Sequence, residues 1–137
     1  MWTYRQASGV LDHDGAIVGV GYSGAPGAKN LPSMQEVHSA GPIPRGLYTI
    51  SGPCCTAQLA AVQNCPSCGG FGAHKHGPFV LRLTPDRANQ MFGRGGFLMH
   101  GDSVAHPGTA SQGCIVMDRA VREKVAMNAD NRLEVIA

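Results

Sequence analysis

Short apolar runs separated by turn residues recur along the chain and predict a mainly β fold. The runs "WTYRQ" at 2–6, "AIVGVGY" at 16–22 and "LYTISG" at 47–52 are rich in β-branched and aromatic residues, which favour strands. The run "FVLRLT" at 79–84 alternates apolar and polar positions, as a half-buried strand does. We expect a turn at "DHDG", 12–15, to join the first two runs, because aspartate tolerates and glycine favours positive φ.

Two segments predict short helices. The tripeptide "TPD" at 84–86 supplies a hydroxyl cap, a proline in the first turn and an acid near the positive end of the helix dipole. It predicts a helix over about 85–91. The run "DRAVREKVAMN" at 118–128 places Val121 and Val125 on one side and predicts a second helix.

The remaining segments predict two strands and a long loop. "FLMHG" at 97–101 is an expected strand whose last side chain is His100, and "LEVIA" at 133–137 is the final one. Prolines and glycines interrupt the segment from 23 to 44, which predicts a loop.

Length and charge limit the classes of protein to which the chain can belong. A chain of 137 residues and 14.3 kDa suits one domain, 1–137, and is too short for two. Charged residues make up 15% and the net charge is +2, which excludes the basic excess of a nucleic-acid-binding protein. No run approaches the ~18 to 20 apolar residues of a membrane helix. The start, "MWTYRQASGV", does not read as a signal peptide, so we expect a protein made in the cytoplasm without one.

The stretch "SQGC" at 111–114 predicts a cysteine nucleophile. A catalytic cysteine needs a base near its thiol and donors for the oxyanion that forms on attack. His100, at a strand end, is the expected base. The amides of Gly113 and Cys114 are the expected oxyanion donors, and Ser111 is expected to orient a neighbour by hydrogen bonding. An isolated cysteine is more often buried and inert, but glycine and polar neighbours do not make a core.

A second histidine competes for the role of base. His106 precedes Pro107 and is held extended in a loop, where a histidine is more often a solvated rim residue, so we favour His100. Asp102 is expected either to orient His100 or, as aspartate commonly does, to cap the following turn.

The segment at about 53–77 is rich in cysteine. It contains Cys54, Cys55, Cys65 and Cys68. An even set beside one reactive thiol favours disulfides in an oxidising compartment. Zinc is the alternative, because the last two have ligand spacing and His74 and His76 follow. Adjacent cysteines fit zinc poorly, because neighbouring side chains in an extended chain point to opposite faces, and the pairing stays open.

These residues also resemble a known family. "GPFVLRLTP", "MFGRGGFLMHGDS" and "ASQGCIVM" are similar to segments of the L,D-transpeptidase-like cysteine enzymes, in which a histidine after a strand precedes a Ser-x-Gly-Cys turn. With "YRQASG", "GYSG" and "GPIPRGLYTI", the chain resembles the small subfamily that includes type VI secretion L,D-transpeptidase effectors. The resemblance covers nearly all of the chain except the insert at 53–77. It implies one catalytic domain folded as a β-sandwich or barrel with two short helices.

The resemblance implies an activity on peptidoglycan. Cys114 would attack the carbonyl of the third residue of a tetrapeptide stem, at the L-centre of diaminopimelate, and expel the terminal D-alanine. His100 would take the thiol proton and return it to the leaving amine. Water would then give an L,D-carboxypeptidase, and another amine would give crosslinking or D-amino-acid exchange. We expect no cofactor and no metal in this site.

Two positions depart from the larger relatives. They usually carry a histidine where this chain has Gln112, which cannot shuttle a proton. They often carry an arginine two places after the cysteine, where this chain has Val116, so Arg119 or Arg94 is the candidate for carboxylate recognition. We expect substrate contacts from Asp102, Gln112, His106 and Arg94.

The same resemblance implies partners and a place of action. An antibacterial effector would be delivered to the periplasm of a target cell, act there on stem peptides as a monomer, and be matched by a periplasmic immunity protein in the producer. The alternative is a non-catalytic cell-wall-binding module stapled by disulfides or zinc, and Gln112 is its best support.

Overall fold

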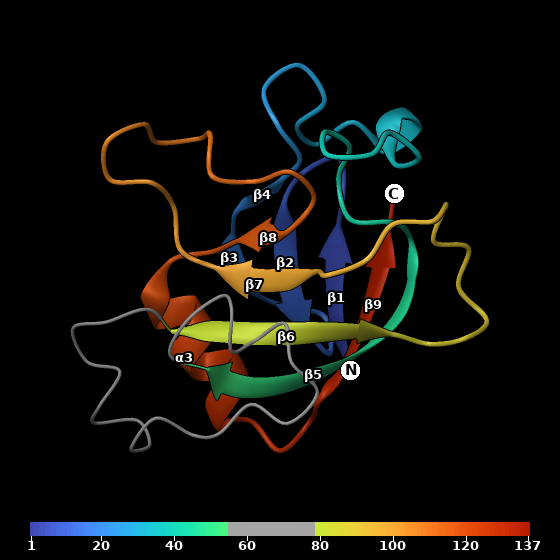
Figure 1. The fold of residues 1–137 in the computed structure, drawn as a ribbon. Coiled ribbons are helices and arrows are strands. Elements are labelled where there is room, and N and C mark those ends of the chain that lie inside the picture. The colour runs from blue at the N-terminus through green and yellow to red at the C-terminus, as the bar shows by residue number, and fades with distance from the viewer. Residues whose placement is uncertain (55–78) are drawn as a thin grey trace.

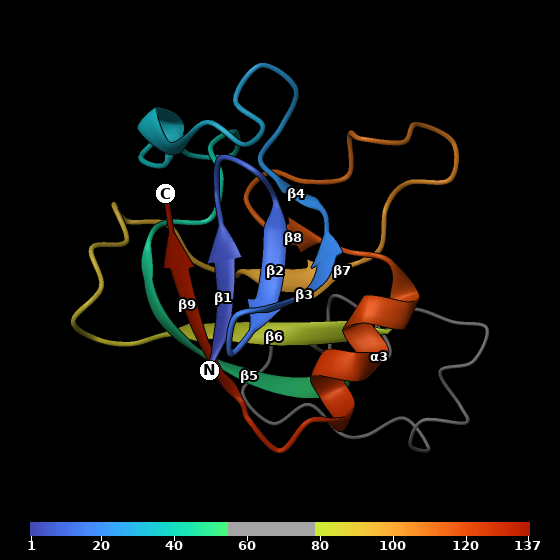
Figure 2. The same cartoon turned by 180° about the vertical axis from the view of Figure 1, so that it is seen from behind.

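The computed structural model describes residues 1–54 and 79–137, and nine strands in these residues form one sheet. The strands are β1 (Trp2–Arg5), β2 (Val10–His13), β3 (Ala16–Val20), β4 (Tyr22–Ser23), β5 (Gly46–Cys54), β6 (Val80–Pro85), β7 (Leu98–His100), β8 (Ile115–Val116) and β9 (Arg132–Ile136). Their order is β3-β2-β1-β9-β5-β6-β7-β8-β4. The outermost strands, β3 and β4, are joined by Gly21 alone, so the sheet curls into a nearly closed barrel (Figures 1 and 2). The expected mainly β class is confirmed.

The N-terminal hairpin differs from the prediction in one strand. The turn at 12–15 joins β2 to β3, and β2 was not predicted. It pairs antiparallel with β1, which pairs parallel with β9 on its other side. The segment "VLDH" was not predicted as a strand because two of its four residues are polar. In the structure Leu11 is fully buried and Asp12 forms an ion pair with Arg5. β2 therefore depends on tertiary partners that a local pattern does not contain.

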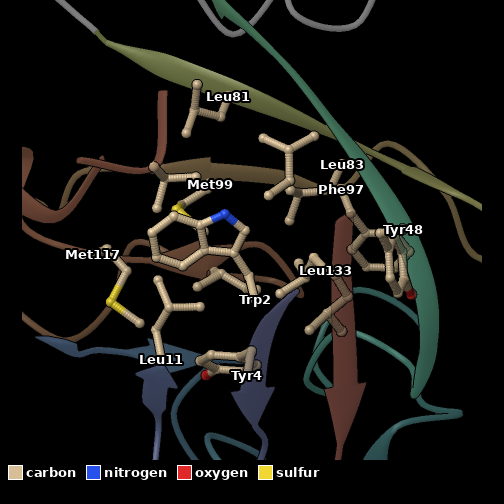
Figure 3. Close-up of a cluster of buried hydrophobic side chains, with 14 of the residues drawn as sticks. Trp2, Tyr4, Leu11, Tyr48, Leu81, Leu83, Phe97, Met99, Met117 and Leu133 are labelled. Carbon is tan, nitrogen blue, oxygen red and sulfur yellow. The ribbon is translucent and has the colours of Figure 1, made fainter. Parts of the chain in front are cut away.

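The core fills the interior of the barrel. In Figure 3 the indole of Trp2 lies at the centre, between side chains from β6 and β7 and side chains from β1 and β2. Its Nε1 donates a 2.9 Å hydrogen bond to the Asp130 carbonyl, so the one polar atom of this buried ring has a partner. Strands β6 and β7 cross β1 and β9 steeply, and β5 curves from one group to the other (Figure 1).

One of the two expected helices is confirmed. Helix α3 (Arg119–Met127) lies over the predicted segment, and its Val121 and Val125 belong to the core. A Cβ at Gly19 of β3 would lie 2.5 Å from a methyl carbon of Val121, so glycine allows the helix to approach the strand. Within the described residues, the only other helix is a short 3-10 turn, η1 (Pro32–Met34), in the expected loop.

The predicted helix at 85–91 is wrong. β6 continues through the proposed cap Thr84 and ends at Pro85, and the chain then forms a turn. Asp86 pairs with Arg132 of β9 at 2.7 Å instead of capping a helix. Asn89 accepts from the backbone N–H of Leu47 and donates to its carbonyl, at 3.0 and 2.8 Å. These side-chain bonds to neighbouring strands replace the local bonds that a helix would need.

The cysteine-rich insert lies almost wholly outside the described residues. The expectations of disulfides or zinc at Cys54, Cys55, Cys65 and Cys68, and of ligands at His74 and His76, concern side chains that are not described. Across residues 1–54 and 79–137, no helix has the length and apolar character that a membrane crossing requires.

Candidate active site

The structure places His100 and the thiol-bearing Cys114 on the same face of the sheet. Strands β7 and β8 are parallel neighbours, with His100 opposite Val116 (Figure 1). Because side chains alternate along a strand, residue 114, two places before Val116, points to the same side as His100. The backbone of Leu98, two places before His100, hydrogen-bonds the thiol. The two predicted reacting groups therefore lie at the end of β7 and immediately before β8, and the loop 101–113 connects them.

One hydrogen bond settles which nitrogen of His100 can act as a base. Nδ1 lies 2.8 Å from the carbonyl oxygen of Gly101. A carbonyl can only accept, so Nδ1 carries the proton and Nε2 of the neutral ring keeps its lone pair. A Cβ at Gly101 would lie 2.8 Å from Nη2 of Arg122, so glycine at this position lets the guanidinium pack against the backbone that orients the imidazole.

The Cys114 thiol is half-buried and packs against Val80 and Leu98. Burial raises its pKa, while the Leu98 hydrogen bond and the charge of Arg94 act in the opposite direction. The thiol is consequently protonated at rest at neutral pH. Nucleophilic attack from this position needs a base that removes the proton.

Ser111 holds the turn that carries the thiol. Its side chain is buried, with 1% of its surface exposed. The hydroxyl donates to the Cys114 carbonyl at 2.6 Å and accepts from the amides of Gly24 and Gly113 at 2.9 and 3.0 Å. These three bonds orient the backbone of the turn. The Gly113 amide is engaged by Ser111, so the oxyanion role predicted for it does not fit this arrangement.

Gly113 is required for a steric reason that the sequence did not reveal. Its φ is +145°, and a Cβ would lie 2.6 Å from Nη2 of Arg94 and 2.9 Å from the ring of Phe97. The position therefore has neither the backbone conformation nor the space for a side chain. Glycine here lets a guanidinium and an aromatic ring pack directly against the residue before Cys114.

Arg94 is not placed to clamp a substrate carboxylate. Its side chain is buried, and Nη1 donates to the carbonyls of Gln35 and Pro42 at 2.6 and 2.7 Å. Nη2 donates to the carbonyls of Gly41 and Gln112 at 2.8 and 3.2 Å. All four Nη hydrogens are thus used by the backbone, and no bidentate face remains for a ligand.

A cavity of about 290 Å³ opens beside the thiol. It is lined by His38, Ser39, Gly93, Arg94, Gly95, Gly96, Phe97, Gln112, Gly113 and Cys114. Three segments far apart in the sequence form its walls, and the lining contains no carboxylate among the described residues. The exposed Gln112, predicted to contact substrate, is in this wall, and the predicted His100, His106 and Asp102 are not.

His38 is a cavity residue that the sequence did not point to. Its Nε2 lies 2.6 Å from the carbonyl of Phe92, which ties the loop at 35–42 to the loop at 92–97. No spacing relates His38 to the 100–114 stretch, so only the folded loops bring it to the cavity.

Asp102 shapes the loop between the two reacting groups. Its carboxylate accepts from the Tyr22 hydroxyl at 2.5 Å and from the amides of Ser103 and Gly108 at 2.8 and 3.0 Å. Although burial raises its pKa, these bonds and the charge of Lys29 outweigh that effect and lower it. Its bonds make Asp102 the turn-former that the sequence offered as one alternative.

His106 lies exposed in the same loop. Its backbone amide donates to the Ser103 hydroxyl at 3.0 Å, and its carbonyl accepts from Thr109. These bonds hold the loop backbone and leave the ring outside the cavity wall. Its placement matches the rim position that favoured His100 as the base.

One group with metal-ligand geometry occurs in residues 1–54 and 79–137, away from the cavity lining. His13, Asp14 and Asp130 offer ligand atoms within 4.8 Å of one another. The ammonium of Met1 lies 2.6 Å from both carboxylates, so this group already holds a cation of its own chain.

Comparison with known proteins gives one match. The model of a family described as the Tlde1 domain matches residues 18–137. No curated protein and no solved structure matches the chain. The matched range contains His100, Cys114 and every residue that lines the cavity. The chain therefore belongs to the Tlde1 domain family, a family of type VI secretion effector domains.

Proposed function

We propose that this protein is a cysteine-dependent L,D-carboxypeptidase or L,D-transpeptidase that acts on the tetrapeptide stems of peptidoglycan. The observation that supports this most directly is the position of His100 on β7 and of Cys114 immediately before the parallel neighbour β8, with Cys114 in the wall of a cavity of about 290 Å³. An effector domain that acts on the cell wall is consistent with membership of the Tlde1 family.

The proposed reaction begins with proton transfer. Nε2 of His100, which keeps its lone pair because Nδ1 is bonded to Gly101, takes the thiol proton of Cys114. The thiolate attacks the carbonyl carbon of the third stem residue, and a tetrahedral oxyanion forms. The imidazolium then protonates the amine of the terminal D-alanine as the C–N bond breaks. A thioester on Cys114 and free D-alanine result.

The second half resolves the thioester. His100 takes a proton from water or from an incoming amine, which attacks the thioester carbonyl, and the sulfur leaves and is reprotonated. Water gives a tripeptide stem, and an amine gives exchange or a crosslink. Because the Gly113 amide is bonded to Ser111, the Cys114 amide is the remaining candidate among the two predicted oxyanion donors.

Membership of a type VI secretion effector family supports a proposal for the place of action. We propose that the protein is delivered by a type VI machine into the periplasm of a target cell, where its substrate lies. A producer that receives the same effector from sister cells would then need an immunity protein in its own periplasm.

The experiment that tests the function is the release of D-alanine from purified tetrapeptide muropeptides, followed by mass spectrometry. Wild-type protein is expected to shorten the stem, Cys114→Ala to abolish this, and His100→Gln to slow it by about 10² or more. His106→Gln is the matched control, because His106 lies in the exposed loop and not on a strand beside Cys114, and it is expected to retain activity. Full release by Cys114→Ala would contradict the mechanism. Absence of release by a folded wild-type protein that still binds muropeptides would favour the non-catalytic wall-binding module.

A further inference from the structure

Arg94 is a buried cation without a carboxylate partner. No ion pair joins its guanidinium to an acid in the described part of the chain, and the groups that satisfy it are four backbone carbonyls. Taking a charge out of water is costly, and the desolvated guanidinium has a lowered pKa for that reason. Two explanations are open for a buried, charged Arg94. Either the guanidinium interacts with an anion that forms during function, or its role is structural and a neutral group could replace it.

The guanidinium is fixed immediately behind the nucleophile. Its carbon lies 5.3 Å from the centre of the Phe97 ring, and Nη2 occupies the space that a Cβ of Gly113 would take. Nη2 also donates to the carbonyl of Gln112 at 3.2 Å. Two consecutive residues before Cys114 therefore contact the same guanidinium group.

The Cys114 thiol is an ionisable group on which the charge of Arg94 acts. Arg94 and Cys114 line the same cavity, and the charge of Arg94 favours the ionised thiol. Among the described residues, His38 is the other titratable group in the cavity wall, and the charge of Tyr48 from β5 acts on Arg94. His100 lies on β7, beside the segment that carries Cys114. None of them is a carboxylate, so no fixed negative charge competes with the thiolate for Arg94.

We propose that Arg94 is a positioning residue of the reaction, which stabilises the Cys114 thiolate by its charge and fixes the Gln112–Gly113 turn by its hydrogen bonds. This inference rests on the proposed function, because it concerns the same nucleophile. It replaces substrate binding, the role that the sequence predicted for Arg94. Arginine suits it better than lysine, because a planar fork with five donors can hold several carbonyls at once.

The pH dependence of thiol alkylation tests the role of the charge. Iodoacetamide reacts with the thiolate, so the midpoint of the rate against pH reports its formation at Cys114. Cys54, Cys55, Cys65 and Cys68 are distinguished by peptide mass spectrometry. Arg94→Gln is expected to raise the midpoint by about 1 pH unit or more, which is the effect of removing an opposite charge at short range. Arg94→Lys keeps a charge and is expected to raise it less, and the exposed Arg87→Gln is the control without effect.

Comparing the Gln and Lys variants distinguishes an electrostatic role of Arg94 from a purely structural one. A purely structural role predicts that the Gln and Lys variants at Arg94 behave alike, with the midpoint of wild type and a lower rate at every pH, and this result would overturn the proposal. If Arg94→Gln does not fold, a measurement on the wild-type protein tests the same proposal. The guanidinium ¹⁵N resonances of Arg94 are expected to shift with the same midpoint as alkylation, and resonances that do not respond would also overturn the proposal. Alkylation needs no peptidoglycan, so a failure to release D-alanine would count against the proposed function alone.

Discussion

The Tyr22 hydroxyl donates a 2.5 Å hydrogen bond to Asp102, across 80 positions of the sequence. The same oxygen accepts from the amide of Ala110 at 3.0 Å. Burial, and then the bond to Asp102, raise the pKa of Tyr22 to about 12. One side chain of the two-residue strand β4 thus bonds both the start and the end of the loop that connects His100 to Cys114.

Removing that hydroxyl is expected to impair activity more than stability. Tyr22→Phe leaves the Ala110 amide and one Asp102 oxygen without this partner, and the free energy of unfolding is expected to fall by about 1 kcal/mol. D-alanine release is expected to fall several-fold, because the loop then samples other positions. The measurements are chemical denaturation and muropeptide turnover.

Tyr4→Phe provides the matched control for this change. The Tyr4 hydroxyl is buried and has no hydrogen-bond partner among the described residues. Loss of an unsatisfied buried hydroxyl is neutral or stabilising, so both measurements are expected to stay at or above their wild-type values. Equal losses in the two variants would contradict the role given to Tyr22.

Adding one methyl group at Gly113 is expected to disrupt the site. In Gly113→Ala the new Cβ meets Arg94 and Phe97 at 2.6 and 2.9 Å, in a backbone conformation that disfavours side chains. Strain of this kind costs about 1–3 kcal/mol, and the displaced guanidinium is expected to reduce D-alanine release more than tenfold. Thermal unfolding and turnover measure the two effects.

Gly95→Ala is the control for Gly113→Ala. Gly95 lines the same cavity, but nothing lies within 4 Å of its Cβ position. Stability is expected to change by no more than about 0.5 kcal/mol. A tolerated alanine at Gly113 would show that the turn can move without loss of the site.

Elements that depend on local sequence patterns were predicted correctly, and contacts between segments remote in sequence were not. His100 was placed correctly at the end of its strand because "FLMHG" is a local signal. The helix expected at 85–91 failed because Asp86 and Asn89 bond to strands that are remote in sequence. Gly113 was predicted as a special position for the wrong reason, since the groups that exclude a side chain arrive from another loop.

The ion pair that replaced the expected helix is expected to make stability depend on pH. The hydrogen bond from Arg132, together with its charge, outweighs desolvation and lowers the pKa of Asp86 below its ordinary value of 3.8. A carboxylate whose pKa is depressed in the folded state stabilises above its unfolded pKa, and this contribution is lost as the pH falls through the folded value. Between pH 6 and pH 2 the melting temperature of Asp86→Asn is therefore expected to fall less than that of wild type. Parallel curves for the two proteins would show that this pair contributes nothing measurable.

Ser111→Ala tests whether the turn around the nucleophile depends on one hydroxyl. The change leaves the amides of Gly24 and Gly113 without their acceptor in a buried place, and each unsatisfied donor costs about 1–3 kcal/mol. The Cys114 carbonyl also loses its donor, so the thiol is expected to be held less firmly relative to His100. We expect a lower free energy of unfolding and a fall in kcat for D-alanine release, with KM changing little because Ser111 does not line the cavity. Ser103→Ala, which removes a hydroxyl bonded only within the exposed loop, is the control, and a fall in kcat of the same size there would contradict a specific role for Ser111.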